Sequence, residues 1–199
     1  MLNPQHIVHI FPDKDTLDHA AVDFWLSQAQ QAIQERGSFH VALTGGSSPQ
    51  AMYRLLAQGE YKNRIDWQKL HIYIGDERFV PHEHPDSNYG MAKNCLLDHV
   101  AIPSGNLHPI LTEELTPAQS AEQYAAEIQT NIPDKVDHLP RFDLIMLGMG
   151  DDGHTASLFP DTDILAVNDK TVAAVYVDKL SSWRVSLTYP TLNAARQCM

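Results

Sequence analysis

The sequence has few cysteines and no long apolar run. Cys95 and Cys198 are its only two cysteines, too few for a disulfide framework, so we predict a cytoplasmic protein. No stretch approaches the roughly 18–20 apolar residues that cross a bilayer, which argues against a membrane protein. The first residues, MLNPQHIVHIFPDKD, lack the basic start and the apolar core of an export signal.

Basic residues are also scarce. Lys and Arg number 14 against 25 Asp and Glu, which gives a net charge of −11. Nucleic acids and anionic membranes bind clusters of Lys and Arg, so neither is the expected partner. A small anionic ligand remains compatible with this charge, because one or two arginines are enough to hold a phosphate. The 199 residues and 43% hydrophobic content predict one domain, 1–199, with a sizeable core.

Strand-like and helix-like patterns alternate along the chain. Predicted strands cover 7–11, 39–44, 71–74, 142–147, 172–177 and 185–188. Predicted helices cover 14–36, 49–58, 88–99 and 117–131, the first capped by Asp13 and ended by Gly37. This alternation predicts an α/β fold with a largely parallel central sheet.

The last residues suggest one more short helix. Thr191 is placed to cap the segment TLNAARQCM, which gives only about two helical turns. A helix that short is marginal alone. We therefore expect either that it docks tightly or, the alternative we favour, that the sequence lacks its natural C-terminal portion.

A glycine-rich loop separates the second predicted strand from its helix. Gly45 and Gly46 let the backbone approach an anion, while Ser47 and Ser48 offer hydroxyl groups beside a helix N-terminus. The loop is not a Walker motif, because the Gly-Lys-Ser/Thr ending is absent. An ordinary tight turn with Ser48 as the helix cap explains the same residues equally well.

The segment 148–160, GMGDDGHTASLFP, follows the most apolar predicted strand. Its match to the dinucleotide pattern G-x-G-x-x-G is accidental, since two carboxylates would face the pyrophosphate. His154 is a candidate general base, because the nearby Asp152 carboxylate can hold its tautomer and raise its basicity. The competing interpretation is a buried histidine bonded to backbone.

Two arginines complete a candidate anion site. Arg78 follows a predicted strand and is suited to pair with a phosphate, while Asp76 or Glu77 bonds sugar hydroxyls or orients the base. Arg184, at the start of another strand, is a further candidate. A surface ion pair for Arg78 and solvent exposure for Arg184 are the alternatives.

Other chemistries lack support in the sequence. His82, Glu83 and His84 alternate in an extended stretch, yet no clear third ligand accompanies them, so we expect no metal. Neither cysteine has a CxxC partner or an activating neighbour, and no G-x-S-x-G elbow of a serine hydrolase is present.

With these motifs identified, the sequence resembles the 6-phosphogluconolactonase family over essentially its whole length. The resemblance rests on LTGGSSP at 43–49, IGDERFVP at 74–81, DSNYGMA at 86–92, GMGDDGHTASLFP at 148–160 and WRVSLTYPTLNAAR at 183–196. It implies a three-layer α/β fold related to glucosamine-6-phosphate deaminase and ribose-5-phosphate isomerase.

The resemblance also implies a reaction. Members hydrolyse 6-phospho-D-glucono-1,5-lactone to 6-phosphogluconate in the oxidative pentose phosphate pathway, without metal or organic cofactor. By the family pattern, His154 activates water, and Gly45 to Ser48, Arg78 and Arg184 bind the phosphate. Members continue beyond the NAAR helix into another strand and a segment that grips the phosphate, so we expect this chain to lack that portion.

Two alternative functions fit parts of the sequence less well. A glucosamine-6-phosphate deaminase or isomerase carries a further carboxylate after the histidine, whereas 155–160 here reads TASLFP, which favours hydrolysis. A non-catalytic sugar-phosphate sensor of the kind found in transcription regulators carries a DNA-binding domain. The strand expected at 7–11 leaves no room for one.

Overall fold

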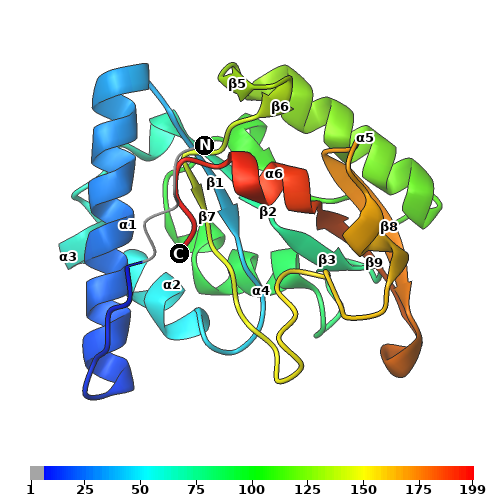
Figure 1. The fold of residues 1–199 in the computed structure, drawn as a ribbon. Helices are drawn as coiled ribbons and strands as arrows, with labels where there is room; N and C mark the ends of the chain where they lie inside the picture. Colours follow the sequence, from blue (N-terminus) through cyan, green and yellow to red (C-terminus); the bar gives the residue numbers. More distant parts are fainter. Residues whose placement is uncertain (1–6) are drawn as a thin grey trace.

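Parallel strands form the central sheet of the protein (Figure 1). In this computed structural model, which describes residues 7–199, the strand order is β4-β2-β1-β7 and all three pairings are parallel. The strands are β1 (Phe39–Leu43), β2 (Leu70–Ile74), β4 (Leu107–His108) and β7 (Leu144–Ile145). All five residues of β1 are buried, as expected for a strand covered on both faces. The predicted parallel sheet is confirmed.

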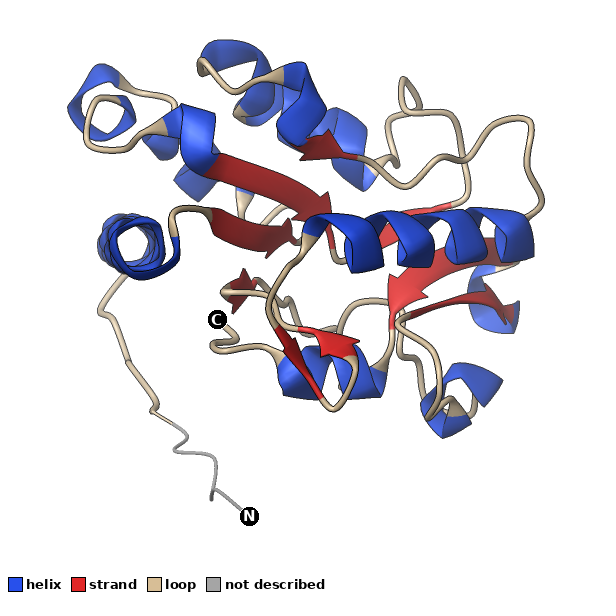
Figure 2. Ribbon diagram, turned by 90° about the horizontal axis from the view of Figure 1, so that it is seen from above, coloured by secondary structure: helices blue, strands red, loops and turns tan. Residues whose placement is uncertain are grey.

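Helices lie on both sides of the strands, so the fold has helix, sheet and helix layers (Figure 2). The helices are α1 (Lys14–Arg36), α2 (Gln50–Leu56), α3 (Gly59–Lys62), α4 (Asn88–Cys95), α5 (Pro117–Asn131) and α6 (Tyr189–Ala194). Two buried tyrosines tie helices to strand ends: Tyr53 of α2 hydrogen-bonds the backbone of Thr44, and Tyr124 of α5 hydrogen-bonds that of Ile74. No helix among the described residues is long and apolar enough to cross a membrane.

Local sequence signals account for the two longest helices. Asp13 accepts a hydrogen bond from the Thr16 amide at the start of α1, and Gly37 ends the helix with φ of 85°, as predicted. Thr116 and Gln119 form a reciprocal capping box at the start of α5. These contacts satisfy amide groups that the helices themselves leave free.

A second, antiparallel sheet extends the fold beyond Gly75. Its strand order is β3-β9-β8, formed by β3 (Asp76–Arg78), β8 (Val172–Val177) and β9 (Ser182–Leu187). The Gly75 amide donates to Leu43 of β1, whereas its carbonyl accepts from Leu187 of β9. The chain thus passes from one sheet to the other at this residue. Residues 76–78, expected only to follow the strand predicted at 71–74, form the strand β3 themselves.

Several predicted boundaries were wrong. Residues 7–11 form no strand, because no neighbouring strand pairs with them within the described residues, 7–199. The strand expected at 142–147 is reduced to β7, the predicted strand at 185–188 begins already at Ser182, and the helix expected at 88–99 ends at Cys95. A one-turn 3-10 helix, Leu97–His99, follows it. The remaining strands form a small hairpin, β5 (Lys135–Val136) with β6 (Leu139–Pro140).

The C-terminal residues dock against the central sheet. Helix α6 begins at Tyr189 rather than at Thr191, whose buried hydroxyl donates to the Thr171 carbonyl. Beyond the helix, residues 197–199 run beside β7, where the amide of Met199 donates to Ile145 and its carbonyl accepts from Leu147. The last residues therefore dock tightly, and the expected absence of a further C-terminal portion stays a prediction.

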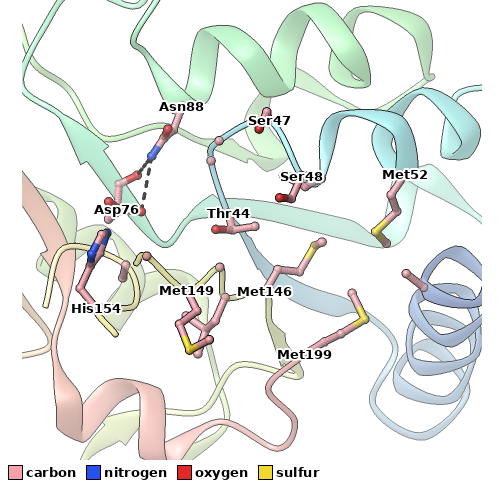
Figure 3. Close-up of a pocket in the computed structure, with 18 of the residues that line it drawn as sticks. Thr44, Ser47, Ser48, Met52, Asp76, Asn88, Met146, Met149, His154 and Met199 are labelled. Carbon is pink, nitrogen blue, oxygen red and sulfur yellow. Dashed lines mark hydrogen bonds between the residues drawn. The ribbon is translucent and has the colours of Figure 1, made fainter. Parts of the chain in front are cut away.

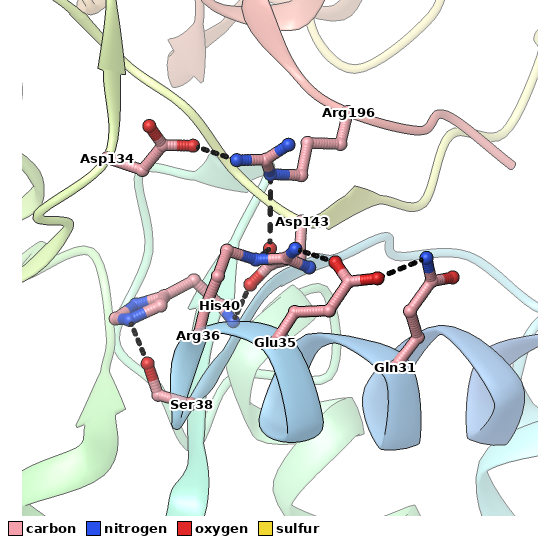
Figure 4. Close-up of polar contacts among 8 residues, drawn as sticks. All are labelled: Gln31, Glu35, Arg36, Ser38, His40, Asp134, Asp143 and Arg196. Atoms are coloured by element: carbon pink, nitrogen blue, oxygen red, sulfur yellow. Dashed lines mark hydrogen bonds and ion pairs between the residues drawn. The ribbon is translucent and has the colours of Figure 1, made fainter.

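The amino-terminal end of the parallel sheet carries a paired polar cluster (Figure 4). The buried Asp143 carboxylate lies 2.9 Å from Arg36 Nε and 3.6 Å from Arg196 Nε. Its other oxygen accepts the His40 amide at 2.8 Å. Glu35 and Asp134 in turn pair with Arg36 and Arg196. This network joins α1, β1, β7 and the segment after α6.

Candidate active site

The carboxyl ends of β1, β2 and β7 meet at two adjoining cavities of about 540 and 330 Å³. In parallel α/β sheets this edge is the usual ligand site. Asp76, Arg78 and His154 line both cavities. Figure 3 shows His154 and Asp76 at one end of the larger cavity, with Met52 toward the other.

The structure brings all nine predicted site residues to these cavities. The larger one adds Gly45, Gly46, Ser47 and Ser48 to the shared three residues, and the smaller one adds Asp152 and Arg184. The segments that carry them are far apart in the sequence and meet only because β1, β2, β7 and β9 end or turn together.

His154 is held in one orientation on the turn after β7. Its Nδ1 lies 2.5 Å from Asp152 Oδ1, and its ring stacks on Phe159 with centroids 3.9 Å apart. Burial lowers the pKa of His154; the Asp76 carboxylate opposes this shift, and Arg184 and Arg78 add to it. A lowered pKa keeps the imidazole neutral near pH 7, the form that accepts a proton.

Two glycines make room for this histidine. A Cβ on Gly150 would lie 2.1 Å from His154 Cε1, so the ring occupies the space that a side chain would need. Gly153 has φ of 81°, a conformation that closes the turn just before His154 and that side chains rarely adopt. The glycines of this segment therefore serve the histidine rather than a nucleotide.

Asp152 has a second partner that the sequence prediction did not assign. Lys179, from the turn between β8 and β9, forms an ion pair with Asp152 Oδ2, and its ammonium lies 4.7 Å from the Phe159 ring centroid. No sequence signal connects two positions 27 residues apart on separate loops.

The two arginines are neighbours on adjacent strands of the antiparallel sheet. Arg78 of β3 is the register partner of Arg184 of β9, and the Nε atoms of both are buried without a hydrogen-bond partner among residues 7–199. Arg78 donates from Nη1 to the Asp86 carbonyl. Burial, and next the neighbouring Arg78, lower the pKa of Arg184, which is 9% exposed. Solvent exposure, the alternative considered for Arg184, is wrong.

Asp76 and Glu77, considered together from sequence, have different surroundings. Glu77 is fully buried and accepts the amides of Asn88 and Tyr89 at the start of α4, at 2.6 and 2.8 Å. Burial raises its pKa, and these amides oppose the shift. It lines neither cavity, so its place is structural. Asp76 points into the site.

The glycine-rich loop packs against α4. A Cβ on Gly45 would lie 1.8 Å from Asn88 Oδ1, so only glycine fits there, and Gly46 has φ of 88°. Lys14 of α1 donates to the Ser48 carbonyl at 3.3 Å. Helix α2 begins at Gln50 after Pro49, and no side chain caps it, so Ser48 is not its N-cap.

The histidines near residue 83 take part in loop contacts. The His82 Nε2 atom lies 2.8 Å from the Ile110 carbonyl oxygen, and His84 Nδ1 accepts the Asp86 amide at 3.1 Å. Both histidines therefore hydrogen-bond backbone groups that hold this proline-rich loop in place.

A parallel sheet with a histidine–carboxylate pair and two neighbouring arginines at a crevice beside its carboxyl edge is the arrangement of an α/β enzyme. The sequence profile of the family described as glucosamine-6-phosphate isomerases/6-phosphogluconolactonase matches residues 12–199. The chain belongs to this family, and the predicted resemblance is confirmed.

Curated relatives and solved structures agree with this assignment. The chain is 40% identical to a 6-phosphogluconolactonase of Nostoc over 94% of this chain and 76% of that protein. It is 41% identical to one of Synechocystis over 95% and 76%. The structure of 6-phosphogluconolactonase from Trypanosoma brucei superposes with a TM-score of 0.84 at 27% identity, covering 96% of this chain and 79% of that one.

Proposed function

We propose that this chain is a 6-phosphogluconolactonase that hydrolyses 6-phospho-D-glucono-1,5-lactone to 6-phosphogluconate in the oxidative pentose phosphate pathway. Its relatives in Nostoc and Synechocystis carry that name. The observation that carries the proposal is the His154–Asp152 pair, which lies beside Arg78 and Arg184 where the two cavities adjoin. A small phosphorylated lactone is the expected ligand.

His154 activates water in the proposed mechanism. Asp152 accepts the Nδ1 hydrogen, so Nε2 is free to take a proton from water as its oxygen attacks the lactone carbonyl carbon. The tetrahedral intermediate then collapses and breaks the bond between that carbon and the ring oxygen. The imidazolium of His154 returns its proton to the departing ring oxygen. Asp152 stabilises the imidazolium between these two transfers.

Arg78 and Arg184 hold the phosphate in this proposal. Their buried Nε groups have no protein partner among residues 7–199, and a phosphate dianion would supply both charge and acceptors. Gly45 to Ser48 line the larger cavity opposite and offer further amide and hydroxyl donors. Only side chains and backbone groups of the chain are used, so the mechanism requires no metal or organic cofactor.

The residues after His154 favour hydrolysis over isomerisation. Moving a proton between neighbouring sugar carbons needs a further base, and positions 155–160 supply none. Ser157 is fully buried against Asp76, and Phe159 stacks on the histidine ring. We infer the lactonase rather than the deaminase branch of the family.

Three coarser expectations accompany this proposal. Cys95 and Cys198 are both free, which suits a reducing, cytoplasmic compartment. The buried hydrophobic residues from Val22 to Leu192 form one cluster, which suits a single domain. The net charge of −11 is the reason we propose no nucleic-acid partner.

The test is a lactonase assay coupled to 6-phosphogluconate oxidation, with spontaneous hydrolysis subtracted. His154→Ala should lower kcat by about 10²–10⁴-fold, the usual contribution of a general base. The melting temperature should change little, because His154 lies on a turn outside the helices and strands and its side chain is 25% exposed.

His84→Ala, on a loop outside both cavities, is the matched control and should retain wild-type kcat. Near-normal turnover by His154→Ala would remove this residue from the mechanism. Ammonia release from glucosamine 6-phosphate by the wild type would instead favour the deaminase branch.

A further inference from the structure

One face of the antiparallel sheet carries the Asp76 carboxylate and the guanidinium groups of Arg78 and Arg184, and the carboxylate forms no ion pair with either of them. Asp76 and Arg78 are two positions apart on β3, and their register partners on β9 are Ser186 and Arg184. Residues two apart on a strand, and residues directly opposite, point to the same face. The Asp76 carboxylate therefore shares one small surface with both guanidinium groups.

The expected ion pairs are absent. Within residues 7–199, no Asp76 oxygen lies within 4.0 Å of a nitrogen of Arg78 or Arg184, although the Nε atoms of both arginines are buried and unpartnered. Asp76 is 7% exposed and Arg184 is 9% exposed. Buried opposite charges this close ordinarily pair, because each otherwise remains desolvated without compensation.

Two neighbours hold Asp76 in place. Ser157 Oγ donates to Asp76 Oδ2 at 2.7 Å, and Asn88 Nδ2 donates to the Asp76 carbonyl at 2.7 Å and to Oδ1 at 3.4 Å. Ser157 is itself rigid: its side chain is fully buried, and its amide donates to Ser186 Oγ at 3.2 Å. The short bond from Ser157 is the stronger restraint on the carboxylate.

We propose that Ser157 is a positioning residue whose hydroxyl holds the Asp76 carboxylate away from Arg78 and Arg184, so that both arginines stay free for the phosphate of the ligand. The identity of that ligand rests on the proposed function. Without the hydroxyl, Asp76 Oδ2 loses its buried donor and turns to the guanidinium groups on the same face. The resulting ion pair competes with the phosphate for the same N–H groups.

The test measures binding of 6-phosphogluconate and of inorganic phosphate to the whole chain by titration calorimetry. Ser157→Ala should weaken both by about tenfold, the loss expected when one charge-assisted interaction is diverted. Adding Asp76→Asn should restore affinity to within about twofold of Asp76→Asn alone, since a neutral amide does not compete for the arginines. In the lactonase assay, Ser157→Ala should raise KM more than it lowers kcat.

Ser120→Ala is the matched control, because Ser120 is equally buried and hydrogen-bonded but lies outside both cavities. Its binding constants should be those of the wild type. A folded Ser157→Ala with unchanged affinity would overturn the proposal, as would a double variant that binds as weakly as Ser157→Ala. So would a folded wild type that binds neither probe. A wild type that binds both probes without lactonase activity would instead overturn the proposed function alone.

Discussion

At the amino-terminal end of the parallel sheet, the Asp143 carboxylate is shared by two arginines and a backbone amide. At the carboxyl end, Asp76 lies on one face with two arginines and pairs with neither. Both carboxylates are about equally buried, at 6% and 7% exposure. Burial alone therefore does not distinguish them; their pairing does.

The same contrast separates the histidines. His40 stacks on His71 with ring centroids 4.5 Å apart, and His71 Nδ1 lies 3.2 Å from His108 Nε2. The other ring nitrogen of His108, Nδ1, lies 2.8 Å from Glu127 Oε1. The rings fill the space between strands and helix α5. His154 instead lies on a cavity wall with Nδ1 held by Asp152. Buried polar groups that are partnered by other protein groups stabilise a fold, whereas polar groups left free on a cavity wall are available to a ligand.

The largest effect on stability is expected from breaking the polar cluster around Asp143. Asp143→Asn should lower the free energy of unfolding by about 2–3 kcal/mol, because it leaves two arginines without their shared carboxylate. The loss falls short of that for a fully buried pair, since the side chains of Arg36 and Arg196 are 26% and 31% exposed. Urea unfolding measures this change, and KM for the lactone should not move.

Asp98→Asn is the control, because the Lys93–Asp98 pair is about half exposed and should contribute nothing measurable. Equal stability of the Asp143 and Asp98 variants would remove the contrast between the two ends of the sheet.

A smaller effect, opposite in sign on stability, is expected at the open end. Arg184→Met removes a buried cation that has no partner in the described part of the chain and that faces Arg78. The melting temperature should rise by a few degrees. The affinity for 6-phosphogluconate should fall by about 10- to 30-fold, since a bond to a charged group is lost. A variant that melts lower and binds normally would contradict the assignment of this arginine.

A pH dependence of stability is also expected, and it originates in the buried cluster of His40, His71 and His108. Burial, and next the neighbouring His71 and His108, lower the pKa of His40 to about 3. The unfolded chain, with a histidine pKa near 6.5, then binds more protons than the folded chain between these values. Stability should fall as pH drops below about 6.5, by up to about 1.4 kcal/mol per pH unit.

His40→Gln should flatten this slope. The comparison between the two proteins removes the contribution of Asp143, whose pKa is raised by burial and which acts in the opposite direction. Parallel stability curves for wild type and variant between pH 4 and about 6.5 would show that His40 does not carry the effect.

Local signals in the sequence predicted much of the fold. Asp13 and Gly37 mark the ends of α1 correctly because capping depends on residues within one turn. Two strands of the antiparallel sheet, β8 and β9, were predicted, yet β3 and the pairing of all three were not. Strand pairing depends on residues that are distant in the chain, such as Arg78 and Arg184.

Local signals in the sequence predicted part of the candidate site as well. Residue type and spacing identified His154 with Asp152, the glycine-rich loop and Arg78, because each lies within a contiguous motif. The same motifs left Asp76 and Glu77 as alternatives, because the partners of Glu77 at the start of α4 lie 11 and 12 residues further along. Ser157 and Lys179 went unassigned because their partners, Asp76 and Asp152, reach them only in the folded chain.

The sequence by itself determined the family, the alternating helices and strands, and the side chains available for chemistry. These follow from local periodicity and from motifs whose members are close in the chain. Tertiary structure alone decided which charged groups are paired and which remain open. That outcome depends on the meeting of β3 with β9 and on the buried hydroxyl of Ser157, which lies 81 residues from the carboxylate it holds.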